Sequence, residues 1–511
     1  MDLLLMFLVL CGIVYGVFSV LFGGSKSSAA RKVLGDSAGA KSLLLGIFRP
    51  NAVTRRKGAK FLSDKEIKKQ LNPRNSGLLI DGDKLRLTPQ SSFTHCMVVA
   101  PTGAGKSTRY VLPNLLTLDN CSFIVTDPSG ELHEKSAAAL RAKGFDILVV
   151  EPSSPSTSLC YNPLAGIQSY NDITEISKTL VRSSIEGEMK AGDSFWYDGA
   201  ADLISVLIRC LISAGDEYLN LGNLLYLLQN FEGDGRGLVH FLEKHADEAA
   251  LNQFKGIITG NSNVVQSFVS TALTSLSLLN NPDLANLMST NEVDFSQLRK
   301  KKTALFFIIP SEKIKSYSFI MNLLYKDFFG AMLSTTPDQA REKREKYLPV
   351  YALMDEFGHS RIPDFEVICT TIRKYQVSLS IIIQNFSQLE TNYGEAQAKT
   401  IIEGGMQSRI FYPGLPYDTA RAVEHILGKE VIEEVRWNGE VSSSERNLMN
   451  ADRIRTLPDD NAIFLNFNKE AMLIDTIPSY GNKRFHSQLK KKNKSSRISR
   501  TIPPFQRVSL S

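Results

Sequence analysis

The sequence predicts an α/β nucleotide-binding domain that is interrupted by an all-α domain and preceded by one N-terminal transmembrane helix. Three observations lead to this fold class: a near-complete phosphate-binding loop at 100–107, apolar strands that alternate with helices on both sides of a long helical stretch, and an uncharged apolar run at 3–22. Strands that alternate with helices indicate a parallel sheet whose two faces are covered.

The composition is that of a folded protein with several units. The 511 residues are too many for one ordinary domain, and 43% of them are hydrophobic and 22% charged. The six cysteines form no C-x-x-C pair, and no histidine lies at ligand spacing from them. We therefore expect reduced thiols and no structural metal.

The charge is distributed unevenly along the chain. Residues 26–69 hold twelve Lys/Arg against three Asp/Glu, and residues 483–511 hold nine Lys/Arg and no acid. With Asp2 also counted, the total of +6 leaves residues 70–482 with a net charge of −11. The body of the chain therefore lacks the bulk basic surface of nonspecific DNA-binding proteins.

The N-terminal run at 3–22 is long enough to cross a bilayer as one helix. A cleaved signal peptide is the alternative, but no basic residue precedes the run, which is also longer than an ordinary signal core. Basic residues follow it and place the C-terminal side in the cytoplasm. The basic segment 49–71 is predicted to be a mostly helical juxtamembrane segment that is either simply solvated or also attracted to anionic lipid.

Further along the chain, turn residues and apolar runs mark the elements. A hairpin is predicted over 78–88, helices over 107–118 and 133–143, and a loop over 437–444. Strands are predicted over 94–99, 122–126, 146–150, 303–309, 348–354, 378–383 and 408–412, with a terminal hairpin over 462–475.

These signals divide the chain into six segments. They are a transmembrane anchor at 1–25, a basic juxtamembrane linker at 26–75, the first part of the nucleotide-binding domain at 76–162, an all-α inserted domain at 163–300, the second part of the nucleotide-binding domain at 301–480, and a basic disordered tail at 481–511.

The phosphate-binding loop follows the pattern G-x-x-x-x-G-K-[ST], except that Ala100 stands in place of the first glycine. An alanine in ordinary β conformation at the end of a strand is compatible with such a loop. We expect Lys106 to reach the β and γ phosphates of ATP and Ser107 to bind Mg²⁺. The candidate nucleotide-binding residues are Thr102, Gly103, Ala104, Gly105, Lys106, Ser107 and Thr108.

The acidic partner of this loop is predicted at the end of the strand over 348–354. Two carboxylates follow it, of which Asp355 is expected to bind Mg²⁺ through water and Glu356 to polarise the attacking water. A solvated strand cap is the alternative for this pair. The second carboxylate favours hydrolysis over transfer to a substrate hydroxyl.

Other polar residues are weaker candidates. Gln384 follows the strand over 378–383, where it either senses the γ-phosphate or caps the strand. Arg373 with Lys374, and separately Arg409, are either surface residues or phosphate contacts supplied to a neighbouring subunit. Asp127, after the strand over 122–126, either orders water or metal or has no such role. The histidines His95 and His359 have no ligand partner at useful spacing, so a core or surface role is expected.

These motifs together resemble the type IV secretion coupling-protein family, the TraG- or TraD-like membrane-anchored ATPases of conjugation and effector secretion. The resemblance covers roughly residues 78–478. It rests on A-P-T-G-A-G-K-S-T at 100–108, T-D-P-S-G-E-L at 126–132, F-W at 195–196, L-M-D-E-F at 353–357 and Q-N-F-S-Q-L at 384–389 followed by Y-G at 393–394.

The resemblance implies a RecA-like domain interrupted by an all-α domain and assembled as a homo-hexamer beneath the bacterial inner membrane. It implies ATP and Mg²⁺ as cofactors. The implied partners are the type IV secretion channel subunits, relaxase and DNA and/or effector proteins, and inner-membrane lipid. The chain departs from the family at Ala100 and at Ser129, where a lysine is common, and has one predicted membrane span where relatives commonly have two.

Three functions stay open at this point. The leading one is an ATP-driven motor that delivers a relaxase-bound DNA strand, or effectors, to a secretion channel. The second is a cargo receptor whose nucleotide binding switches assembly with little pumping, and the third is a related translocase for chromosome segregation or DNA packaging. The basic tail is compatible with DNA, anionic lipid or an acidic partner, or with a solubilising role only.

Overall fold

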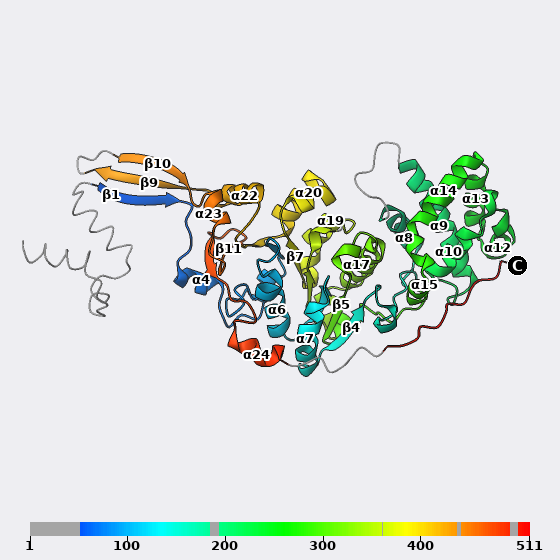
Figure 1. Ribbon diagram of the computed structural model, residues 1–511, viewed down its shortest axis with the longest axis horizontal. Coiled ribbons are helices and arrows are strands. Elements are labelled where there is room, and N and C mark those ends of the chain that lie inside the picture. Colours follow the sequence, from blue (N-terminus) through cyan, green and yellow to red (C-terminus); the bar gives the residue numbers. More distant parts are fainter. Residues whose placement is uncertain (1–51, 184–193, 360, 437–440, 491–498, 511) are drawn as a thin grey trace, which may run out of the picture. The chain divides into compact units, whose positions relative to one another are not determined.

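The computed structural model describes residues 52–183, 194–359, 361–436, 441–490 and 499–510 (Figure 1). Within these ranges no helix combines the length and the apolar character that a membrane crossing needs. The anchor predicted over 3–22 lies outside the described residues and stays a prediction. The chain divides into two compact units, one of which contains residues 428–448 together with the strand over 52–58.

The larger unit is built on a nine-stranded sheet with the order β12-β11-β8-β2-β7-β6-β3-β5-β4. The strands from β8 to β4 are parallel, and β11 and β12 add an antiparallel hairpin at one edge. Their bounds are β2 Cys96–Val99, β3 Ser122–Thr126, β4 Asp146–Val150, β5 Thr303–Phe307, β6 Val350–Met354, β7 Val377–Ile383, β8 Ser408–Phe411, β11 Asn461–Asn466 and β12 Met472–Asp475. All the strands predicted from apolar runs are therefore present.

Helices cover both faces of this sheet, which explains why its central strands are continuous apolar runs. Every residue of β2, β3, β5, β6 and β7 is buried. Phe123 and Val125 of β3 pack into the main core with residues of α6 (Leu112–Thr117). Thr126 points to the opposite face, where its hydroxyl is hydrogen-bonded to that of Tyr325 in α17 (Ser318–Leu333).

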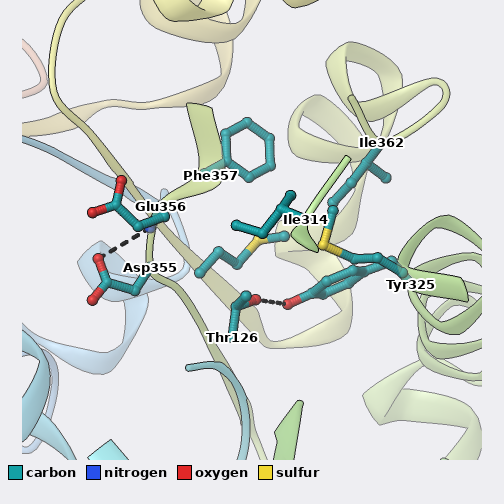
Figure 2. Close-up of a pocket in the computed structure, with 9 residues that line it drawn as sticks. Thr126, Ile314, Tyr325, Asp355, Glu356, Phe357 and Ile362 are labelled. Carbon is teal, nitrogen blue, oxygen red and sulfur yellow. Dashed lines mark hydrogen bonds between the residues drawn. The ribbon is translucent and has the colours of Figure 1, made fainter. Parts of the chain in front are cut away.

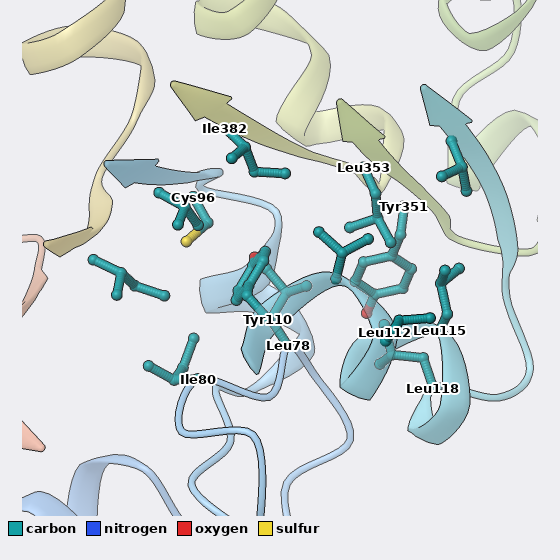
Figure 3. Close-up of a cluster of buried hydrophobic side chains, with 14 of the residues drawn as sticks. Leu78, Ile80, Cys96, Tyr110, Leu112, Leu115, Leu118, Tyr351, Leu353 and Ile382 are labelled. Atoms are coloured by element: carbon teal, nitrogen blue, oxygen red, sulfur yellow. The ribbon is translucent and has the colours of Figure 1, made fainter. Parts of the chain in front are cut away.

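The hairpin predicted over 78–88 packs against this core (Figure 3). Leu87 donates its backbone N–H to Leu78 O at 2.9 Å, which closes the hairpin. Asn114 of α6 is fully buried and holds it through both amide atoms, since Leu79 N donates to Asn114 Oδ1 at 2.8 Å and Asn114 Nδ2 donates to Leu79 O at 2.9 Å. Tyr110 reaches β7 from the same side, and its hydroxyl lies 2.8 Å from Ser380 Oγ.

The described residues between β4 and β5 contain helices and no strand. The long helix α9 packs against α8, α10, α12, α13 and α14, so it forms the centre of this helical part. The helices are α8 Tyr170–Arg182, α9 Ser194–Ala214, α10 Leu221–Gln229, α11 Glu232–Gly235, α12 Val239–His245, α13 Glu248–Ile258, α14 Ser262–Ser275, α15 Pro282–Leu287 and α16 Gln297–Lys300.

The remaining helices surround the sheet or follow it. They are α4 Asp64–Gln70, α5 Pro89–Ser92, α7 Glu131–Ala142, α18 Pro337–Glu342, α19 Phe365–Thr371, α20 Ser387–Tyr393, α21 Glu395–Lys399, α22 Tyr417–Leu427, α23 Ala451–Arg455 and α24 Lys483–Leu489. The segment boundaries predicted at 75, 162 and 300 stay predictions.

Two sequence predictions are corrected by strand β1 and its partners in the smaller unit. Segment 49–71 is not mostly helical, because its described part forms β1 (Ala52–Gly58) and only the short α4. The loop predicted over 437–444 is also wrong in its described part, because β9 (Lys429–Arg436) and β10 (Val441–Asn447) form an antiparallel sheet with β1. Charge pairs replace apolar alternation here: Lys57 Nζ lies 2.8 Å from Glu433 and Arg446 Nε lies 2.7 Å from Glu430.

The tail predicted as disordered over 481–511 is ordered where it is described. Its helix α24 buries Phe485 completely against Leu79, Leu116 and Ala139. Residues 499–510 lie on the helical part of the chain and bury Val508. A few apolar contacts with residues distant in sequence are enough to hold the tail, although its overall composition is basic and polar.

The burial of Phe485 predicts a measurable contribution of α24 to stability. We expect Phe485→Ala to lower the free energy of unfolding by about 3–5 kcal/mol, the usual cost of removing a buried phenylalanine ring. Urea denaturation followed by circular dichroism measures this change. The exposed neighbour Ser487→Ala is the control, with an expected change within about 0.5 kcal/mol. Equal midpoints for both variants would show that α24 is not docked.

Candidate active site

The phosphate-binding loop connects β2 to a helix that starts with a π-helical turn, Ser107–Val111. Gly103 and Gly105 have φ of 86° and 80°, the left-handed region that glycine adopts without steric cost. A Cβ at Gly105 would lie 3.1 Å from Arg109 Nε and 3.2 Å from Thr108 Oγ1, whereas nothing lies within 4 Å of one at Gly103. Gly105 is therefore packed closely against the following helical turn, whereas Gly103 faces open space.

Ala100 explains why the first glycine of the pattern is dispensable here. It is fully buried and continues β2, since its backbone N–H donates to Ile383 O at 3.0 Å. Its φ is not in the left-handed region. Its methyl group is part of the main core, so the alanine predicted to be tolerated at this position is accommodated without strain.

The loop faces the acidic pair at the end of β6. Lys106 Nζ contacts Glu356 Oε1 and lies 3.8 Å from Asp355 Oδ1, while Ser107 Oγ donates to Asp355 Oδ2 at 3.0 Å. Strand β2, which leads into the loop, and strand β6, which ends at the acidic pair, are separated only by β7. Gln384 follows β7 and completes the cluster, because its Nε2 donates to Glu356 Oε2 at 3.1 Å. The structure thus brings together the residues predicted from both motifs.

Glu356 is held in an unusual backbone conformation. Its φ is 54°, in the left-handed region that costs a residue with a Cβ roughly 1–2 kcal/mol. The next residue anchors the turn: the ring of Phe357 lies 4.6 Å from that of Phe365 and 6.1 Å from that of Tyr393. Figure 2 shows both carboxylates beside a small pocket that Phe357, Thr126 and Tyr325 help to line.

His359 is the site residue that the sequence reasoning missed. Its Nε2 lies 3.0 Å from Glu356 Oε2, in the turn that follows β6. The spacing of three residues was the available signal, because a short helical turn places residues three apart on one side. Glu356 is therefore contacted by Lys106, Gln384 and His359.

The two adjacent carboxyl groups have pKa values shifted in opposite directions. Burial raises the pKa of Asp355, and the neighbouring Glu356 adds to this effect against the attraction of Lys106. Burial also acts to raise the pKa of Glu356, but the hydrogen bond and charge of Lys106, the hydrogen bond from Gln384 and the charge of His359 outweigh it and lower this pKa. Glu356 is thus held ionised.

Asp127 lies on the neighbouring strand, at the end of β3, and caps α7. Its Oδ2 accepts from His133 N at 2.8 Å. Burial raises the pKa of Asp127 to about 6, with a contribution from the negative charge of Asp355. The observed role is therefore a helix cap, and a role in ordering water or metal stays a prediction.

Three predicted cations do not reach this cluster. Arg373 and Lys374 are exposed in the turn before β7, and Arg409 is the second residue of β8, so all three lie toward the amino ends of the parallel strands. The phosphate-binding loop lies at the carboxyl ends. The proposed roles of these residues in a neighbouring subunit stay predictions.

His95 lies at the same amino-end edge, before β2. It is buried, and its Nδ1 accepts from Leu379 N at 3.1 Å. Burial lowers its pKa to about 3, so the ring stays neutral. This geometry agrees with the core role predicted for His95.

The donor set fits Mg²⁺ and a nucleoside triphosphate. A hydroxyl and a carboxylate, Ser107 and Asp355, lie in contact, and Mg²⁺ is commonly bound by one or two carboxylates together with substrate phosphates. The open side of the loop at Gly103 leaves room for phosphate oxygens, which a helix N-terminus attracts. A P-loop after a central parallel strand, facing an acidic pair two strands away, defines the class of P-loop α/β proteins.

Residues 55–500 match the protein family described as "Type IV secretory system Conjugative DNA transfer", and the chain belongs to this family. It is 25% identical to Protein VirD4 of Rhizobium rhizogenes over 387 residues, which cover 73% of this chain and 56% of that protein. It is 22% identical to Conjugal transfer protein TraG of Escherichia coli over 380 residues, which cover 68% of this chain and 57% of that protein. The chain thus spans little more than half the length of these relatives.

Solved structures of a conjugative coupling protein have the same fold. The trigonal form of TrwBdeltaN70 in complex with sulphate superposes with a TM-score of 0.66 at 16% identity, covering 88% of this chain and 96% of that one. Plasmid coupling protein TrwB in complex with ADP and Mg²⁺ gives a TM-score of 0.63 at 15% identity, covering 84% and 95%. The α/β fold with a phosphate-binding loop that the sequence predicts is therefore confirmed.

Asp127 provides a test of the electrostatics of the site. Its folded-state pKa of about 6 lies above the ordinary 3.8, so its protonated form contributes stability that is complete below pH 3.8 and is lost as the pH rises through 6. The variant Asp127→Asn does not lose this stability as the pH rises, because asparagine does not ionise. We expect the variant to gain about 2 kcal/mol on the wild type between pH 4 and pH 7, measured by urea denaturation at several pH values.

Asp119→Asn is the matched control. The hydrogen bond from Lys302 lowers the pKa of Asp119, so this variant should lose stability relative to the wild type as the pH rises. Parallel stability curves for Asp127→Asn and the wild type would show that Asp127 titrates normally in the folded chain.

Proposed function

We propose that this chain is a Mg²⁺-dependent ATPase that acts as a coupling protein of a type IV secretion system. The observation that carries the proposal is the cluster of Lys106, Ser107, Asp355, Glu356 and Gln384, which joins a phosphate-binding loop to an acidic pair. TrwB has been solved in complex with ADP and Mg²⁺ and with a non-hydrolysable ATP analogue, and this likeness, together with family membership, supports the proposal.

Each residue of the cluster has a defined task in this proposal. Ser107 and Asp355 hold Mg²⁺, which neutralises phosphate charge when it is bound. Lys106 exchanges its contact with Glu356 for phosphate oxygens. Glu356 then keeps its contacts with Gln384 and His359, which favour its ionised form and hold its carboxylate in place, and it polarises the attacking water.

The wider role follows from the family and from the sequence. We propose that the chain recruits relaxase-bound single-stranded DNA, effector proteins or both, and drives them to the secretion channel. The run at 3–22 is proposed to anchor it as a single-pass protein in the bacterial inner membrane, with the main body in the cytoplasm. A homo-hexamer, in which Arg373 of one subunit contacts the nucleotide of the next, is proposed as the working assembly.

Glu356→Gln tests the motor against the nucleotide-switched receptor. We expect this variant to keep ATP affinity within about threefold and to lose roughly 10²–10⁴-fold in hydrolysis rate, the usual contribution of a positioned general base. Fluorescent-nucleotide binding and phosphate release measure the two quantities. The exposed Glu395→Gln, which makes the same chemical change at the start of α21, should leave both unchanged.

DNA transfer by the same variants decides the function. A motor requires that Glu356→Gln abolish transfer while cargo still co-purifies with the protein. Undiminished transfer would instead favour the receptor. Lys106→Ala should abolish ATP binding, and retained binding would show that the loop at 100–107 is not the nucleotide site.

A further inference from the structure

The C-terminal segment 499–510 lies along the helical part of the chain, near α10 and α15 (Figure 1). Most of its side chains are exposed, and only Val508 is buried. It nevertheless makes specific contacts at three points along its length. We name the surface that receives it the tail groove, formed by Ser158, Gly222, Asn223, Asn286 and Glu292.

The first contact is a two-pronged ion pair. Arg500 Nη1 donates to Glu292 Oε1 at 2.7 Å, and its Nη2 contacts Oε2 and donates to Ser158 O at 2.9 Å. The hydrogen bond from Arg500 is the main reason that the pKa of Glu292 falls to about 2, although Glu292 also accepts from Cys160 N. This planar geometry selects arginine over lysine.

The second contact selects an aromatic side chain. The ring of Phe505 lies over Gly222 of α10, where an added Cβ would be 2.6 Å from a ring carbon. Gly222 has no left-handed φ, so the backbone does not require glycine there. The glycine at position 222 therefore matters because it leaves space for the Phe505 ring. Phe505 is also fixed through its backbone N–H, which donates to Asn286 Oδ1 at 3.2 Å.

The third contact binds the peptide backbone. Asn223 is fully buried, and its Nδ2 donates to Gln506 O at 2.9 Å while its Oδ1 accepts from Val508 N at 3.0 Å. A carbonyl and an N–H two residues apart point the same way only in an extended chain. Pro503 and Pro504 precede this stretch, and prolines favour an extended backbone before binding.

The charge of the two partners is complementary. Residues 163–300 contain 17 Asp/Glu and nine Lys/Arg, and the tail 483–511 contains nine Lys/Arg and no acid. Such complementarity speeds association and favours basic peptides over acidic ones. The tail stays bound because it is tethered to the same chain, which raises its effective concentration at the groove.

We propose that the tail groove is a peptide-docking site for a partner protein, and that this chain's own tail occupies it as a competing intramolecular ligand. The partner presents an extended basic segment with an arginine, an aromatic residue five positions later and a small aliphatic residue three positions after that. Two further contacts add to these, since Gln506 Nε2 donates to the Tyr218 hydroxyl at 2.9 Å and the Arg507 guanidinium lies over the Tyr226 ring. A segment that reproduces the main side-chain and backbone contacts displaces the tail. This proposal does not depend on nucleotide hydrolysis.

The test uses the full chain and a fluorescein-labelled peptide of residues 499–511. A tail-release variant, Arg500→Ala with Phe505→Ala and Val508→Ala, leaves the groove intact. We expect it to bind the peptide at least tenfold more tightly than the wild type in fluorescence anisotropy, since its own tail no longer competes. Equal binding by the two chains would overturn the proposal.

Gly222→Ala in the tail-release variant blocks the space for the aromatic ring. Alanine is favoured over glycine inside a helix, so this change should preserve folding, which thermal unfolding verifies. We expect it to weaken peptide binding at least tenfold. A scrambled peptide of the same composition is the control for charge attraction alone, and equal affinity for it would overturn the proposal.

Sedimentation velocity of the wild-type chain distinguishes a partner protein from a second copy. We expect Gly222→Ala to leave the sedimentation coefficient unchanged. Association that Gly222→Ala abolishes would assign the groove to tail exchange between copies and overturn the proposed partner.

Discussion

The contact of Lys106 with Asp355 and Glu356 is the interaction on which the site depends. One ammonium group faces a buried carboxylate, Asp355, and a half-buried one, Glu356, so the three groups carry a net negative charge when all are ionised. The opposite pKa shifts of the two carboxyl groups follow from this imbalance, because Lys106 and Gln384 stabilise the charge of Glu356 while Asp355 is left more deeply buried. A divalent cation beside Asp355 and Ser107 would relieve the same imbalance, which is why this donor set suits Mg²⁺.

This contact requires the sheet order around β7. The loop follows β2 and the acidic pair follows β6, and β7 lies between these strands and contributes Gln384. The helical stretch enters between β4 and β5, which are neighbours at the far edge of the sheet. A large insertion at that edge leaves the register of β2, β7 and β6 unchanged. The helical part therefore adds a surface to the chain without disturbing the chemistry.

The sequence was informative where the signals were local. Apolar runs predicted each parallel strand, and the loop and acidic pair predicted the site, because these patterns are short and their geometry is fixed by the strand that carries them. Prediction failed where the partner was distant in sequence. The charged strand β9 pairs with β1 through contacts such as that of Glu433 with Lys57, and α24 is held by Phe485 in a cluster with residues more than 300 positions earlier. Neither has a periodic apolar pattern that reveals it.

Two buried asparagines illustrate how one interaction serves two different purposes. Asn114 binds the backbone N–H and C=O of Leu79, and Asn223 binds those of Val508 and Gln506. The first, in α6, holds a hairpin that packs into the main core, where release would expose many apolar side chains. The second holds a chain end whose residues are mostly exposed, so release costs only the Arg500 ion pair and the packing of Phe505 and Val508. The same pair of hydrogen bonds thus fixes the fold in one place and makes an exchangeable ligand in the other, and burial of the bound segment decides between the two.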